Sequence, residues 1–145
     1  MTTFIFLVNA AATFSMLGLI WFVQVVHYPL FAETGGEAFA RYAAEHSRLT
    51  TLVVSPPMVA ELVTAVYLVW ERPDGVGRWV VWAGLGLVGV VWLATALLSV
   101  PRHASLGAGF DHAEWSGLVR SNWVRTVAWS LRGLLVFAML WQALP

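Results

Sequence analysis

Four histidines lie at the borders of the long apolar runs that dominate this chain. His27 ends the first run and His46 precedes the second. His103 follows the third run and His112 precedes the fourth, so connectivity places all four at one end of the molecule. Imidazole is a common ligand of zinc, copper and haem iron, and it exchanges protons near neutral pH. The sequence therefore offers four candidate ligands for a transition metal or haem: His27, His46, His103 and His112.

The same histidines allow a second interpretation. No local metal-binding motif such as HExxH or ExxH occurs, so a metal site would have to combine residues from separate segments. Alternatively, His27 and His103 form hydrogen bonds at the membrane interface, while His46 and His112 face water. His27 and His103 are the preferred candidates for ligation or proton transfer, because each lies where an apolar run meets the interface.

Two arginines interrupt the last apolar run, in the stretch NWVRTVAWSLR at residues 122–132. Residues three or four apart share a helix face, so this spacing predicts one polar stripe made of Asn122, Arg125, Trp129 and Arg132. Arg132 lies about 15 Å into the helix at 1.5 Å per residue, near the middle of a bilayer. A lone charge there costs roughly 3 kcal/mol on insertion scales, so we expect Arg132 to have a partner.

Glu61 is the expected partner, because it lies at a similar depth in the second run and both runs are entered from the same end. Arginine can bind a carboxylate through two parallel hydrogen bonds. In one interpretation the Glu61–Arg132 pair holds a helix bundle together. In the other, Glu61, Arg125 and Arg132 form the floor of a polar pocket, since buried pairs often add little stability. The sequence leaves both open.

The composition is that of a membrane protein. Hydrophobic residues make up 59% of the 145 residues and charged residues 11%, against about 25% charged in soluble domains. The net charge is zero, so electrostatics give nucleic acid no reason to bind. The absence of cysteine excludes disulfides, thiolate ligands and a cysteine nucleophile. The chain is thus expected to have the lipid bilayer as its main partner.

Four segments are long enough to cross a hydrocarbon core, which needs about 20 apolar residues. They cover about 4–31, 49–70, 79–100 and 123–144, and predict an all-α membrane four-helix bundle in a single domain, 1–145. A short turn, 71–78, joins the middle pair, and two longer, partly helical loops, 32–48 and 101–121, lie together at the histidine end. In the second of these loops Asp111, with Glu114 three residues later, predicts a helix start.

Prolines are expected to disturb two of the spans. Pro29 should end or bend the first, and Pro56 with Pro57 should kink the second. The two adjacent prolines free the carbonyls four residues before them, which need partners in lipid. Arg125 lies at about the right depth to donate to them. The alternative is a packing kink without a further role.

Loop arginines set the expected orientation. The histidine end carries four of them (Arg41, Arg48, Arg102 and Arg120), and the other end carries Arg72 and Arg78. The positive-inside rule then places the histidine end in the cytoplasm and both termini outside, with the protein in the cell (inner) membrane. A homo-oligomer is compatible with this layout.

Two stretches, WFVQVVHYPLF (21–31) and NWVRTVAWSLRG (122–133), with RHASLGAGFD between them, resemble a group of small four-span bacterial membrane proteins of unknown function. That resemblance covers most of the chain. In size and layout the chain is also similar to the anthrone-oxygenase-like membrane family, whose members oxidise polycyclic aromatic substrates. This second likeness implies an oxidoreductase and assigns no residue roles.

Two functions follow as hypotheses. The first is a membrane oxidoreductase acting on a lipid-soluble aromatic or quinone-like molecule, with a histidine-bound metal or haem. Its catalytic candidates are His27, His103 and Arg125, and its pocket candidates are Tyr28, Glu61, Asn122, Trp123, Trp129 and Arg132. The second is a non-catalytic binding or assembly protein, in which the Glu61–Arg132 pair is structural or the arginines bind an anionic ligand.

Overall fold

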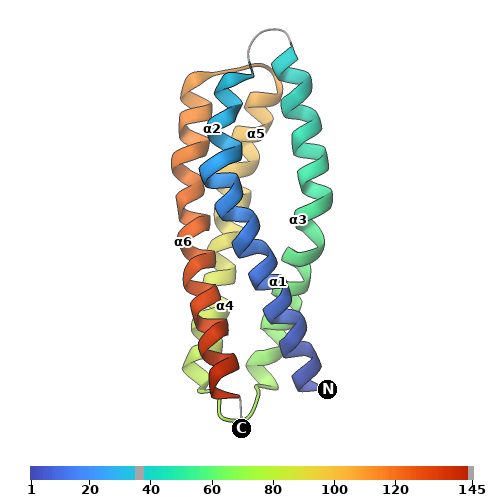
Figure 1. Ribbon diagram of the computed structural model, residues 1–145, viewed down its shortest axis with the longest axis vertical. Helices are drawn as coiled ribbons and strands as arrows, with labels where there is room; N and C mark the ends of the chain where they lie inside the picture. Colours follow the sequence, from blue (N-terminus) through green and yellow to red (C-terminus); the bar gives the residue numbers. More distant parts are fainter. Residues whose placement is uncertain (35–37, 144–145) are drawn as a thin grey trace.

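The computed structural model describes residues 1–34 and 38–143, and throughout these residues the regular structure is helical. Four helical rods run the length of the molecule (Figure 1). The first comprises α1 (Thr2–Phe22), the π-helix η1 (Val23–His27), α2 (Tyr28–Leu30) and the 3₁₀ turn η2 (Phe31–Glu33). The second is α3 (Ala38–Trp70). The third comprises α4 (Arg78–Ala94), the π-helix η3 (Thr95–Ser99) and α5 (Val100–Gly107), and the fourth is α6 (His112–Gln142).

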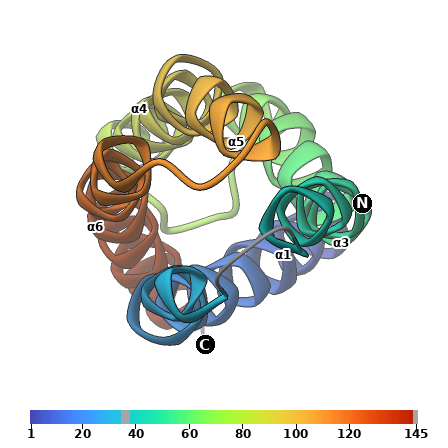
Figure 2. The same ribbon diagram turned by 90° about the horizontal axis from the view of Figure 1, so that it is seen from above.

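Each rod is long and apolar enough to cross a membrane, which confirms the predicted all-α bundle of four spans. Both termini lie at one end, called here the terminal end (Figure 1). The opposite end holds α2, α5 and the starts of α3 and α6 and is called the histidine end. Viewed along the bundle, the rods form a ring in which α1 packs on α3 and α6, and α4 packs on the same two helices (Figure 2).

The two predicted loops at the histidine end are mostly helical extensions of the spans. The second rod is already helical at Ala38 and the third continues to Gly107, so the expected borders near 49 and 100 lie inside helices. Asp111 caps α6, as predicted, because its Oδ1 accepts the backbone N–H of Glu114 at 2.8 Å. Residues 35–37 of the first loop and Leu144, the predicted end of the last span, lie outside the described residues.

The first and third rods share one local device, a π-turn directly before a proline. The N–H of Tyr28 donates to the carbonyl of Val23, five residues back, and the N–H of Val100 donates to Thr95 in the same way. Pro29 and Pro101 follow one residue later. Proline has no N–H, and its ring clashes with the carbonyl four residues before it, so a wider turn relieves the clash and the rod continues. The first rod therefore runs through Pro29 to Glu33.

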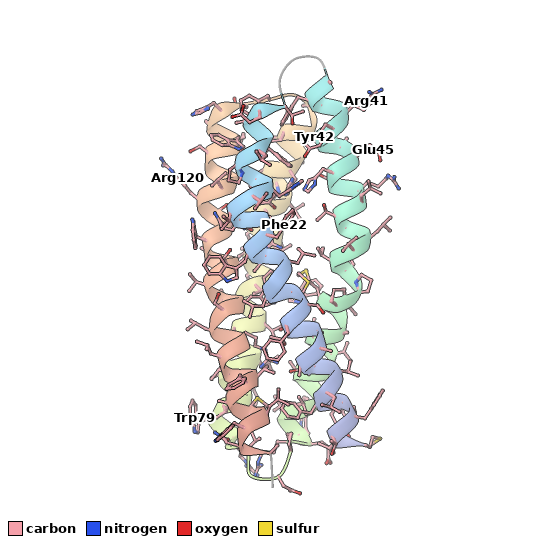
Figure 3. The ribbon with its side chains drawn as sticks, viewed as in Figure 1. Phe22, Arg41, Tyr42, Glu45, Trp79 and Arg120 are labelled. Atoms are coloured by element: carbon pink, nitrogen blue, oxygen red, sulfur yellow. The ribbon has the colours of Figure 1, made fainter. Side chains whose placement is uncertain are left out.

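The charged residues mark the borders of an apolar zone of membrane thickness. Arg48 lies in α3 and Glu71 directly follows its last residue, so about 34 Å separates them at 1.5 Å per residue, which matches a ~30 Å hydrocarbon core. Arg120 lies at the corresponding level of α6. Arg41 and Glu45 on α3 and Arg120 on α6 lie near the histidine end, and Trp79 lies near the terminal end (Figure 3). The histidines thus lie at one border of this zone, and Glu61 lies near its middle.

Candidate functional site

The ion pair predicted between Glu61 and Arg132 lies in the centre of the bundle. Arg132 Nε is 3.6 Å from Glu61 Oε1, and both side chains are almost fully buried. The carboxylate also accepts two hydrogen bonds, from the Thr13 hydroxyl at 2.7 Å and from Trp129 Nε1 at 2.9 Å. Because α3 and α6 lie diagonally across the ring, this pair joins helices whose backbones do not pack together.

Further contacts extend this pair to all four rods. Arg132 Nη2 donates to Asn9 Oδ1 at 2.7 Å, and Asn9 Nδ2 donates to Thr64 Oγ1 at 2.8 Å. On the fourth side, Gly84 of α4 leaves the space that the Arg132 guanidinium fills, since a Cβ there would overlap it. We call this group the mid-membrane network (Asn9, Thr13, Glu61, Thr64, Trp129 and Arg132). Arg132 Nε is buried without a hydrogen-bond partner, but the other contacts tie the group together across the rods, which favours a structural role.

Arg125 lies about 10 Å closer to the histidine end along α6 and has a different environment. Its Nη1 donates to Ser99 Oγ and to Asn122 Oδ1, both at 3.2 Å, rather than to the carbonyls freed by Pro56 and Pro57. Its guanidinium carbon lies 5.3 Å from the Trp129 ring centroid. Its Nε is buried without a partner. The ion pairs found among the described residues are Arg132–Glu61 and the exposed Arg48–Glu45, so Arg125 has no carboxylate partner.

Three of the four histidines meet at the histidine end. His27 Nε2 lies 2.8 Å from His46 Nδ1, a hydrogen bond between the first and second rods. His103 Nε2 lies 2.8 Å from the Tyr28 hydroxyl, which joins the third rod to the first. The rings of His46 and His103 have centroids 5.5 Å apart. We call these four side chains the histidine cluster (His27, Tyr28, His46 and His103).

Two predicted site residues lie elsewhere. His112 is exposed and packs on Trp115, with ring centroids 5.2 Å apart, so it does not join the cluster. Trp123 is exposed and packs edge-to-face on Trp21. Within residues 1–34 and 38–143, no three histidine or carboxylate side chains are placed so that they could hold a metal ion.

A cavity of about 430 Å³, here the inner cavity, lies beside the cluster between the first, second and third rods. One part of its wall is polar and contains Tyr28, His46, Ser99, His103 and Arg125. The rest combines aliphatic residues, among them Leu19, Ile20, Val23, Val54 and Val100, with four hydroxyl side chains (Ser47, Thr50, Thr51 and Thr95). His103 Nδ1 and Arg125 Nε are both buried without a hydrogen-bond partner. The inner cavity therefore joins a largely apolar wall to a buried guanidinium and an imidazole.

The inner cavity does not reach the mid-membrane network. Neither Glu61 nor Arg132 lines it. Beyond the network, towards the terminal end, an apolar layer fills the bundle (Phe6, Leu68, Val76, Val80, Val81 and Met139). A channel needs a continuous polar path, and this layer interrupts it. The site is thus a blind pocket at one side of the membrane.

Several contributors to the site had no local signal in the sequence. Gln24 accepts from Asn122 Nδ2 at 2.9 Å and donates to the carbonyl of Val119, which fixes the Asn122 side chain beside Arg125. Trp115 Nε1 donates to the Tyr28 carbonyl at 2.8 Å and so holds the π-turn region of the first rod. Both contacts join residues far apart in the sequence, so no local motif indicates them.

Comparisons with protein families, curated proteins and solved structures found no match to this chain. Inference about function therefore rests on the chemistry of the pocket. A buried cation, an imidazole and a phenol beside an aliphatic wall can bind an amphipathic molecule, orient its oxygen and exchange a proton with it.

Proposed function

We propose that this multi-pass membrane protein binds a lipid-soluble aromatic molecule, phenolic or quinone-like, in the inner cavity. The carrying observation is that Arg125, a buried cation without a carboxylate partner, and His103 line a largely apolar cavity. An oxygen of a ligand in this cavity can pair with the Arg125 guanidinium, and a hydrogen bond to a charged group is worth about 1.5–3 kcal/mol. The cavity volume of about 430 Å³ is within the usual range for small-molecule sites.

The charge of Arg125 favours a ligand oxygen that carries negative charge. Arginine stays protonated in proteins, and Arg125 is 7% exposed with no carboxylate nearby. An unpaired buried cation is unfavourable until an anion joins it. An ionised phenol or enol satisfies this requirement while keeping the apolar rings that match the aliphatic wall. The ligand class is therefore a weakly acidic aromatic.

The histidine cluster supplies a route for the proton that such a ligand releases. His103 shares a hydrogen bond with Tyr28 at 2.8 Å, and both line the inner cavity. A second positive charge beside Arg125 is unfavourable, so the His103 imidazole passes the proton on rather than keeping it, and the Tyr28 hydroxyl can relay it. Ionisation of the bound ligand is the step that these residues support directly.

We extend this proposal to an oxidoreductase, as the resemblance to the anthrone-oxygenase-like family implies. An ionised phenol or enol gives up an electron more readily than the neutral form. A metal or haem version would draw its ligands from His27, His46 and His103, which would have to move, because their present placement does not form a metal site and the exposed His112 lies apart. It requires metal in stoichiometric amount in the detergent-purified protein and an absorption spectrum that changes in His27→Ala. If neither is found, the metal version is wrong and ligand ionisation stands without it.

The alternative function, a non-catalytic assembly or binding protein, gains support from a separate observation. The mid-membrane network satisfies the Glu61 carboxylate with Thr13, Trp129 and Arg132 and lies away from the cavity. We therefore assign Glu61 and Arg132 to the stability of the bundle and Arg125 to the ligand. The orientation with the histidine end in the cytoplasm stays part of the proposal.

Equilibrium binding tests the proposal. A hydroxyanthraquinone, which is both phenolic and quinone-like, is titrated into the protein in vesicles, and saturable binding is expected. Arg125→Met should weaken it about 30-fold, the effect of losing a hydrogen bond to a charged group worth ~2 kcal/mol. Arg120→Met is the matched control, because Arg120 lies on the same helix and is exposed. Absence of saturable binding, or equal loss in both variants, would contradict the proposal.

A further inference from the structure

A second, smaller cavity lies against the inner one. It has a volume of about 230 Å³, and we call it the outer cavity. Five residues line both cavities: Leu19, Val23, His46, Thr50 and Val54. All five belong to the facing sides of the first rod and α3. The two cavities are therefore separated by little more than one layer of side chains in the seam between these rods.

The outer cavity faces the hydrocarbon region. Its remaining wall includes Phe22, Leu49 and Val53, whose exposed fractions are 57%, 50% and 61%. Val53 lies about 7.5 Å deeper than Arg48 along α3, and Phe22 lies about 7.5 Å deeper than His27 along the first rod. Side chains of this kind at this depth meet lipid chains rather than water.

The seam is weakly held at this level. Among the described residues, the side chains of the first rod and α3 share hydrogen bonds near the membrane centre, at Asn9 and Thr13, and then again at His27. Between these points the contact is apolar. On the α3 side, Pro56 and Pro57 donate no backbone hydrogen bonds to the preceding turn, and on the other side the π-turn of η1 begins at Val23.

We propose that the ligand enters the inner cavity laterally from the bilayer, through the seam between the first rod and α3. It passes Thr50 and His46, and the His27–His46 hydrogen bond closes the seam at the membrane border. This inference rests on the proposed binding function. It adds the route and the source of the ligand, which is the lipid phase and not the aqueous solution.

Blocking the outer cavity tests the route without touching the pocket. Val53 lines the outer cavity and not the inner one, so Val53→Trp places an indole in the seam. Val63→Trp is the matched control, because Val63 is on the same helix with the same 61% exposure and lines neither cavity. Leu49→Trp gives a second, independent block from the other rim of the outer cavity.

Vesicles that hold hydroxyanthraquinone but no protein are mixed in a stopped-flow instrument with vesicles that contain the protein. The absorbance of the dye is then followed over time. Val53→Trp and Leu49→Trp should slow association and dissociation by about tenfold each, with Kd within twofold of the wild type, because a blocked route changes both rates alike. Val63→Trp should behave as the wild type.

The outcomes separate the route from the pocket. Unchanged rates in both blocked variants, with normal Kd, would overturn lateral entry and leave the binding function intact. A weakened Kd with unchanged association would also overturn it, since the indole would then act on the pocket itself. If the wild type shows no saturable binding, the proposed function fails and the route fails with it.

Discussion

Replacing Glu61 and Arg132 by methionine, separately and together, measures whether the mid-membrane network holds the bundle. Glu61→Met leaves the Arg132 guanidinium buried with Asn9 as its hydrogen-bond acceptor and removes the acceptor of Trp129 Nε1. Arg132→Met leaves the carboxylate buried without its cation. Removing one partner of a buried pair costs about 3–5 kcal/mol, so we expect each single variant to lose about 4 kcal/mol of unfolding free energy.

The double variant should be more stable than either single variant. No buried charge remains, and the methionines fill much of the space. Trp129 Nε1 and Asn9 Oδ1 still lose their partners, at about 1–2 kcal/mol each, whereas the Thr13 hydroxyl can turn to a backbone carbonyl of its own helix. The expected loss is therefore about 3 kcal/mol, far below the roughly 8 kcal/mol that two independent changes of this size would give.

Unfolding curves in mixed micelles, with SDS as the denaturant and circular dichroism as the signal, give these free energies. The unfolding free energy should be highest for the wild type, lower for the double variant and lowest for the two single variants. If the two losses add to within about 0.5 kcal/mol, the side chains do not interact and the reasoning is refuted. If all three variants are as stable as the wild type, the pair does not hold the bundle.

Three further perturbations test the positioning of the site. Gly84→Ala should cost about 1–3 kcal/mol, because its Cβ meets the guanidinium of the mid-membrane ion pair, whereas Gly86→Ala on the same helix meets no atom within 4 Å and should be neutral in thermal denaturation. Asp111→Ala should lose about 1 kcal/mol of stability through the missing helix cap, and Asp111→Asn should keep most of it. Trp115→Phe should weaken ligand affinity by more free energy than it removes from the stability of the fold, since the indole holds the backbone carbonyl of Tyr28 beside the pocket.

The fold was largely predictable because long apolar runs leave few alternatives in a membrane. The spans and the short turn between the middle pair follow from composition, and the Asp111 cap from a local motif. The borders of the spans could not be predicted from composition. The segments next to Arg48 and Arg120 are polar enough to read as loops, yet they continue as helix because they pack on neighbouring rods.

The site was only partly predictable. Helical spacing correctly grouped Arg125 with Asn122, and connectivity placed the histidines at one end, where three of them meet. The sequence could not predict that Arg125 and Arg132 have different partners. The difference between them arises from partners on other rods, a carboxylate on α3 for one and a serine on η3 for the other. The π-turns were also unforeseen, because a proline in an apolar run more often indicates a bend or an end.

The absorption spectrum of hydroxyanthraquinone bound in vesicles tests the central claim most directly, because the ionised dye absorbs at longer wavelength than the neutral dye. The pH is set so that the free dye is neutral. The wild type and Arg120→Met should then show the spectrum of the ionised dye, and Arg125→Met should show the neutral one. A neutral spectrum for dye bound to the wild type, or an ionised one that survives in Arg125→Met, would contradict the assignment of Arg125 to the ligand.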